Sequence, residues 1–67
     1  MHISLRQIQI FQTVAQTENF TRAAEQLHMT QPAISMQVKQ LEEQTGLALF
    51  ERQGKRIVLT EAGRAMH

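Results

Sequence analysis

The stretch from Phe20 to Leu41 constrains the fold of this 67-residue chain most strongly, because it predicts two helices joined by a tight turn. In its first part, apolar residues recur at spacings of three and four: Phe20, Ala23, Ala24 and Leu27. This spacing places them on one face of a helix, and the two alanines allow a second helix to approach closely. The turn is then predicted at residues 28–30.

A second helix is predicted to begin near Gln31. Thr30 is a favourable N-cap because its hydroxyl can accept the backbone N–H of Ala33, and Pro32 in the first turn lacks only an N–H that has no helical partner there. The core face consists of positions that lie within about 40° of one another on a helical wheel: Ile34, Val38, Leu41 and Thr45. The helix is expected to cover about residues 31–45.

The opposite face of this second helix is suited to contact with another molecule. Its outward positions are small or hydrogen-bonding rather than uniformly charged: Gln31, Pro32, Ser35, Met36 and Lys39. A DNA major groove about 12 Å wide admits one α-helix, of which only the first two or so turns reach base edges. A short helix, a turn and a second helix with such an exposed N-terminal face are typical of a helix-turn-helix that reads double-stranded DNA.

Length and composition restrict the chain to one small domain. With 42% hydrophobic and 19% charged residues, it has the composition of an ordinary soluble domain rather than a disordered or membrane-spanning one. The absence of cysteine excludes disulfides and thiolate metal sites. No secretory signal is visible at the N-terminus, so a cytoplasmic location is the default expectation.

The formal charge of +1 is too small to indicate a nucleic-acid partner by itself. The placement of the basic residues is more informative, because five of the seven fall in the two motif helices and a later hairpin: Arg22, Lys39, Arg52, Lys55 and Arg56. These cations could converge on one surface. The alternative is a set of unrelated solvated charges, or an ion pair between Arg52 and a nearby glutamate.

A further helix is predicted ahead of the motif. Ser4 and Gln7 form a capping box, so this helix should cover about residues 5–16. Its apolar positions span about 160° of the circumference: Ile8, Ile10, Phe11, Val14 and Ala15. That arc is wider than one neighbour requires, which leaves its edge for a later helix or a partner chain. Asn19 or Thr21 is expected to cap the next helix.

A β-hairpin is predicted after the second motif helix. Gly46 should end that helix, and strand-like segments then flank a turn at residues 53–55, so that the hairpin covers about residues 50–59. Ile57 and Leu59 should face the core, while the basic tip offers cations to phosphates or a minor groove. Thr60 caps a last helix of barely two turns. The predicted fold class is therefore mainly α: a winged helix-turn-helix with three core helices, a short wing and a helical stub.

These segments together resemble the N-terminal DNA-binding domain of LysR-type transcriptional regulators. The resemblance covers nearly the whole chain and rests on the order and spacing of the following residues: Phe11 with Val14-Ala15, Phe20-Thr21-Arg22-Ala23-Ala24, Leu27-His28, Thr30-Gln31-Pro32-Ala33-Ile34-Ser35, Leu41-Glu42, Gly46, Leu49-Phe50-Glu51-Arg52 and Leu59-Thr60-Glu61-Ala62-Gly63. It implies a bacterial regulator that acts as a homodimer or tetramer, with a small-molecule effector bound by a C-terminal domain that this chain lacks. It also implies a division into a DNA-binding domain at residues 1–59 and the truncated start of a linker or dimerisation helix at residues 60–67.

The resemblance also implies base contacts by four residues of the recognition helix: Gln31, Pro32, Ser35 and Met36. Contacts to the DNA backbone or minor groove are expected from six others: Arg22, Thr30, Lys39, Arg52, Lys55 and Arg56. Many relatives carry arginine at the Met36 position; methionine cannot bind guanine bidentately, so it favours apolar contact such as with a thymine methyl. The Ser-Met-Gln run and the Gly-Lys-Arg sequence of the wing resemble those of the family branch that controls carbon-fixation operons.

The expected dimer-facing residues are Ile10, Val14 and Met66. The stub after Thr60 gives about 10 Å of helix, too little for an interface that normally buries about 1,200 Å² or more. Ile10 and Val14 should then stay partly uncovered, and the chain should be a monomer or weak dimer that binds a single half-site.

Two other classes of function are less consistent with the sequence. Ser35, His28 and the glutamates lack catalytic spacing and no glycine elbow is present, so no catalytic residue is expected. His2, His28 and His67 lack metal-ligand spacing, so neither a metal nor a cofactor is expected. A protein-protein interaction module remains the alternative, since a winged helix need not bind DNA; it should expose Leu, Phe or Tyr anchors on the second motif helix.

Overall fold

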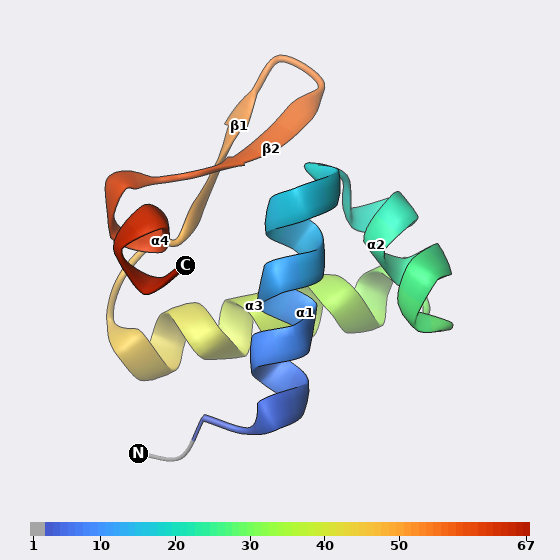
Figure 1. Cartoon of the computed structure of the whole chain (residues 1–67), viewed down its shortest axis with the longest axis horizontal. Coiled ribbons are helices and arrows are strands. Elements are labelled where there is room, and N and C mark those ends of the chain that lie inside the picture. Colours follow the sequence, from blue (N-terminus) through green and yellow to red (C-terminus); the bar gives the residue numbers. More distant parts are fainter. Residues whose placement is uncertain (1–2) are drawn as a thin grey trace.

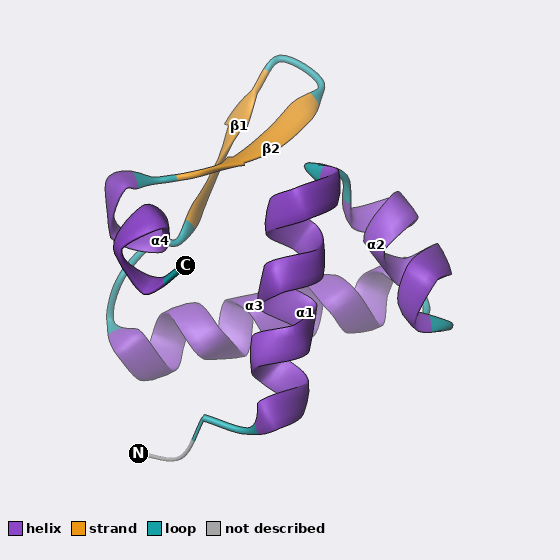
Figure 2. Ribbon diagram, viewed as in Figure 1, coloured by secondary structure: helices purple, strands orange, loops and turns teal. Residues whose placement is uncertain are grey.

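The computed structural model describes residues 3–67, which form helices and one two-stranded antiparallel sheet (Figure 1). The order is α1 (Leu5–Thr17), α2 (Phe20–Leu27), α3 (Gln31–Thr45), β1 (Phe50–Gln53), β2 (Arg56–Leu59) and α4 (Glu61–Met66). The first three helices make up the body, with α1 crossing α3, and the hairpin extends from the body as a wing with α4 at its base (Figure 2). The predicted winged helix-turn-helix is therefore present.

Side-chain caps begin the first two helices. Ser4 Oγ accepts the N–H of Gln7 at 3.0 Å, and Gln7 Oε1 accepts the N–H of Ser4 at 2.9 Å, which completes the predicted capping box. Asn19, rather than Thr21, caps α2 by accepting the N–H of Arg22 at 2.9 Å. These caps satisfy backbone donors that have no partner inside the helix.

Residues in the left-handed backbone conformation, with positive φ, occupy four of the turns and helix ends. Gly46 (φ 71°) ends α3 and Gly54 (φ 61°) forms the hairpin turn, as the sequence predicts. Glu18 after α1 and His28 after α2 adopt the same conformation at φ 56°, although neither is a glycine. L-residues rarely adopt this conformation, so the packing of the helices on either side has to hold both turns in place.

Two clusters of buried side chains form the core. The larger one lies between the three body helices and the wing: Ile10, Val14, Ala23, Ala24, Ile34, Val38 and Ile57. The smaller one joins α1, the second half of α3 and the start of the wing: Phe11, Leu41 and Leu49. Phe50 packs against both clusters, and its ring centroid lies 5.4 Å from that of Phe11. The base of the wing is thus part of the core.

The prediction that Ile10 and Val14 face a partner chain is wrong. They are 1% and 0% exposed, because α2, α3 and Ile57 of the wing cover the part of α1 on which they lie. The uncovered apolar edge of α1 consists instead of Leu5 and Ile8, which are 72% and 40% exposed. Met66, the third predicted dimer-facing residue, is exposed near the end of α4, and its role stays a prediction.

Close packing fixes α4 to the base of the wing. Gly63 is buried, and a Cβ atom at this position would collide with the carbonyl oxygen of Leu49. Thr60 Oγ1 accepts the N–H of Gly63 at 3.0 Å and donates to the carbonyl oxygen of Ala48 at 2.6 Å. The glycine therefore lets the helix backbone lie directly against the segment that enters the wing.

Candidate nucleic-acid interface

The N-terminal part of α3 presents the predicted base-contacting residues on its surface. Thr30 caps the helix by accepting the N–H of Ala33 at 3.3 Å, and Pro32 lies in the first turn. Gln31, Pro32 and Met36 are exposed, while Ser35 is half-buried. The four residues therefore share one open end of the helix, and their contact with bases stays a prediction.

Gln31 and Ser35 are joined by a hydrogen bond that the sequence analysis missed. Gln31 Nε2 donates to Ser35 Oγ at 2.9 Å across one helical turn. The four-residue spacing, which makes two positions neighbours on a helix surface, was the available signal. Held in this way, the Gln31 amide can direct Oε1 and its second N–H outward. An acceptor beside a donor is the pair that glutamine offers to adenine in the major groove.

The register of the hairpin places its basic residues on two different faces. β1 pairs with β2 so that Arg52 lies opposite Ile57 and Gln53 lies opposite Arg56. Residues directly opposite share a face, and successive residues alternate between faces. Arg52 therefore lies on the face of the buried Ile57, and Arg56 lies on the other face. The register therefore separates Arg56 from Arg52, so the wing cations do not all share the single surface on which the basic residues could have converged.

Arg52 and Lys55 lie beside the start of α3. Together with Gln31 they line an open hollow of about 190 Å³. Asn19, Phe20 and Thr21 at the start of α2 form another part of its lining. Cations at the flank of a reading helix can neutralise the phosphates next to the bases that it reads. Asn19 and Thr21 were not among the predicted contacts, although the capping signal marks the start of α2 at this point.

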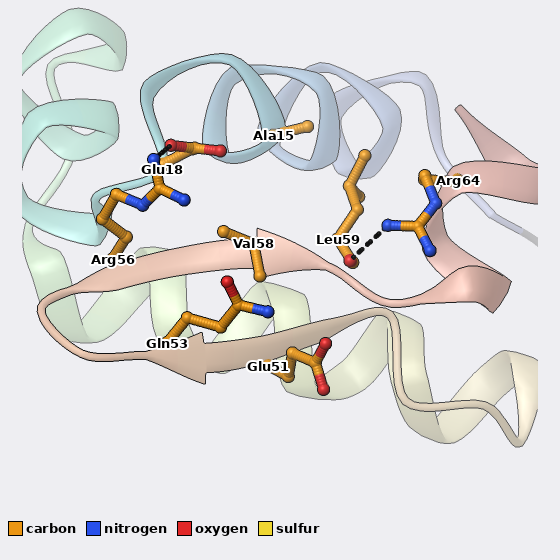
Figure 3. A pocket seen from close by; sticks show the side chains of 8 residues that line it. All are labelled: Ala15, Glu18, Glu51, Gln53, Arg56, Val58, Leu59 and Arg64. Atoms are coloured by element: carbon orange, nitrogen blue, oxygen red, sulfur yellow. Dashed lines mark hydrogen bonds and ion pairs between the residues drawn. The ribbon is translucent and has the colours of Figure 1, made fainter.

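The other face of the wing has a mixed charge (Figure 3). Arg56 lies 3.5 Å from Glu18 in an ion pair, and Glu51 and Arg64 line the same hollow of about 430 Å³. The pair is exposed and therefore contributes little to stability. The intramolecular ion pair considered for Arg52 thus occurs at Arg56, which the structure does not bring together with Gln31.

The remaining predicted backbone contacts lie on exposed positions of the helix-turn-helix. Arg22 on α2, Thr30 before α3 and Lys39 on α3 are all exposed. Of the exposed large hydrophobic side chains within residues 3–67, Met36 is the one on α3, and no exposed Leu, Phe or Tyr accompanies it there. This surface lacks the anchors expected of a protein-binding face.

Within the part of the chain that the structure describes, no group of three or more His, Cys, Asp or Glu is arranged to hold a metal ion. His28 lies in the exposed turn after α2, and the ring centroid of His67 lies 6.1 Å from that of Phe11. His2, the third histidine of the rejected metal group, lies outside the described residues. No helix among residues 3–67 is long and apolar enough to cross a membrane.

The family model of bacterial regulatory helix-turn-helix proteins of the lysR family matches residues 5–64. The chain belongs to this family. It is 64% identical over 64 residues to the RuBisCO operon transcriptional regulator of Allochromatium vinosum, and 61% identical over 66 residues to the HTH-type transcriptional regulator CfxR of Cupriavidus necator. These matches cover 96% and 97% of this chain but 21% of each relative, so the chain spans about a fifth of the length of these regulators.

The fold of this lysR-family chain is also similar to that of a solved protein bound to DNA. The crystal structure of the CbnR_DBD-DNA complex superposes with a TM-score of 0.90 at 41% identity, covering 96% of this chain and 74% of that one. The resemblance to LysR-type regulators, which the sequence analysis drew from the motif residues, is confirmed, as is the winged helix-turn-helix fold.

Proposed function

We propose that this chain is the sequence-specific, double-stranded-DNA-binding domain of a bacterial transcriptional regulator and has no enzymatic role. The observation that carries the proposal is the placement of Gln31, at the open end of α3, beside Arg52 and Lys55 of the wing. Residues 1–59 make up the DNA-binding domain, and residues 60–67 begin a linker helix. In this division the two elements proposed to contact DNA, the start of α3 and the wing, both belong to the DNA-binding domain.

In this proposal the start of α3 lies in the major groove. Gln31, oriented by its hydrogen bond to Ser35, reads an adenine through one donor and one acceptor. Pro32 and Met36 make apolar contacts, and the thymine methyl is the base feature that suits Met36. The preferred half-site should therefore contain an A·T pair at each of these two points.

Phosphate contacts then come from the flank of the reading helix. Arg52 and Lys55 have the strongest structural support, and Arg22, Thr30 and Lys39 add contacts from the helix-turn-helix. If each protomer neutralises about four phosphates, the logarithm of the binding constant should fall with the logarithm of the salt concentration at a slope near −3.6.

The proposal extends to the whole regulator through its relatives. The RuBisCO operon regulator of Allochromatium vinosum supports a promoter of carbon-fixation genes as the target. A regulator of this family would act in the bacterial cytoplasm as a homodimer or tetramer on two related half-sites, with a small-molecule effector bound outside this chain.

The test is selection of bound sequences from a random duplex library, followed by gel shifts on the selected site and on a generic duplex at two salt concentrations. We expect one enriched half-site, and a preference for it that survives moderate salt. If no sequence is enriched and binding to every duplex weakens with salt, the chain binds DNA only by electrostatic attraction, without sequence specificity. No binding to any duplex would favour the protein-protein alternative.

A further inference from the structure

Glu42 connects the recognition helix to the start of the wing. Its Oε2 atom accepts the backbone N–H of Leu49 at 2.8 Å and that of Phe50 at 3.4 Å. Glu42 belongs to the second half of α3, and Phe50 is the first residue of β1. A single carboxylate oxygen thus joins the two elements that we propose to contact DNA.

The backbone at this junction needs such an acceptor. The pairing of the hairpin begins at Phe50 opposite Leu59, so the N–H of Leu49 lies outside the ladder, and Leu49 itself is completely buried. A buried N–H group without a partner is costly, and a bond to an ionised acceptor is about twice as strong as one to a neutral acceptor. Glu42 therefore meets a requirement that no neighbouring strand meets.

Arg52 lies close to the same junction. Glu42, Phe50 and Arg52 line one hollow between α3 and the wing. Phe50 and Arg52 are two residues apart in β1, so their side chains lie on the same face of the strand. A shift of Phe50 relative to α3 would carry Arg52 with it.

We propose that Glu42 is a positioning residue for DNA binding, which fixes the wing at the distance from α3 at which Arg52 reaches phosphates while Gln31 reads bases. The inference rests on the proposed DNA-binding function. It predicts an effect opposite in sign to simple electrostatics. Removal of a negative charge near DNA should tighten binding, whereas loss of a positioning contact should weaken it.

The experiment compares Glu42 with Glu43, the next residue of α3, which is exposed. The variants Glu42→Ala and Glu42→Gln are matched by Glu43→Ala and Glu43→Gln, which remove the same charge from the same helix. For each, the dissociation constant is measured on the selected duplex over a series of salt concentrations, and the exchange of the Leu49 and Phe50 amide protons is followed by NMR. Circular dichroism at the binding temperature verifies that each variant is folded.

We expect the Glu43 variants to bind at least as tightly as the wild type. Glu42→Ala should bind about tenfold more weakly than Glu43→Ala, with Glu42→Gln between them because the amide oxygen is a weaker acceptor. The salt slope of Glu42→Ala should be flatter by about 0.9, the contribution of one phosphate contact. Exchange at Leu49 should be faster in Glu42→Ala and unchanged in Glu43→Ala.

Equal affinity of Glu42→Ala and Glu43→Ala would overturn the inference, and so would weaker binding with an unchanged salt slope and unchanged amide exchange. If Glu42→Ala does not fold, the comparison of Glu42→Gln with Glu43→Gln decides by the same criteria. Failure of the wild-type chain to bind any duplex would be a different result, because it would reject the proposed function itself.

Discussion

The two halves of α3 are held in different ways. Both bury apolar side chains, but two polar side chains of the anchored half (residues 38–45) bond to other elements: Glu42 to the start of the wing and Gln44 to Gln7 of α1. In the reading half (residues 31–37), Gln31 bonds to Ser35 of the same helix. The polar ties to other elements are therefore concentrated in the half of the helix that is not proposed to read bases.

The strongest contrast should appear in stability. Leu41 in the anchored half is 1% exposed, whereas Met36 in the reading half is 54% exposed. Leu41→Ala should lower the free energy of unfolding by about 2–5 kcal/mol, because it removes buried apolar atoms and leaves a cavity. Met36→Ala should change it by less than about 0.5 kcal/mol. Urea denaturation measures both, and similar losses would contradict the placement of Leu41 in the core and of Met36 on the open surface.

The reverse contrast should appear in DNA binding. Gln31→Ala should weaken binding to the selected site by about 1–3 kcal/mol and relax the preference at one or two base pairs. Its free energy of unfolding should stay close to that of the wild type, since the side chain is exposed. Gel shifts on selected and random duplexes measure the effect. If binding to both duplexes fell equally, Gln31 would position the backbone instead of reading a base.

A smaller stability effect should follow from the tie between α1 and α3. Gln7 is buried; its Nε2 donates to Gln44 Oε1 at 3.0 Å, and its Oε1 caps the start of α1. Gln7→Ala should cost about 1–2 kcal/mol, because it removes both interactions. Gln12→Ala, on the exposed side of α1, is the control and should cost less than about 0.5 kcal/mol. The midpoint of thermal unfolding is measured for both variants. Equal midpoints would show that the bond between Gln7 and Gln44 does not stabilise the fold.

The smallest predicted effect is a difference in DNA binding between cations on the two faces of the wing. Arg52→Ala should flatten the salt dependence of DNA binding by about 0.9, since one phosphate contact is lost. Arg56→Ala removes the same charge from the face that carries Glu18, and it should leave the slope nearly unchanged. Titrations at several salt concentrations give both slopes. Equal slopes for the two variants would mean that the strand register does not decide which cation meets the DNA.

The sequence predicted most of the fold because its signals are local. The Ser4 cap, the Thr30 cap and Gly46 each act within one helical turn, and the structure has them where they were expected. The burial of Ile10 and Val14 was missed because periodicity gives the width of an apolar arc but not which neighbours cover it.

The site was predicted less completely, because its arrangement depends on contacts that are distant in sequence. The turn predicted at residues 53–55 would make Arg52 and Arg56 flank it as a pair on one face. The observed pairing of Gln53 with Arg56 leaves two residues in the turn, so the two arginines lie on different faces. A shift of one residue moves a side chain to the other face of a strand. The bond from Glu42 to Leu49 spans seven residues across a loop, and no local pattern predicts it.

Both strands of the wing are tied to the body. Glu42 holds the start of β1 at the base, and the N–H of Ile57, one pair from the turn, donates to the carbonyl oxygen of Glu18 at 3.0 Å, whereas the turn that contains Lys55 is exposed. Because two strands alone are only marginally stable, these ties should hold the strands, and the free energy of local opening should be lowest at the turn itself. The charge of Lys55 at this exposed turn should then attract DNA before the domain docks. This charge should raise the association rate more than it prolongs the lifetime of the complex.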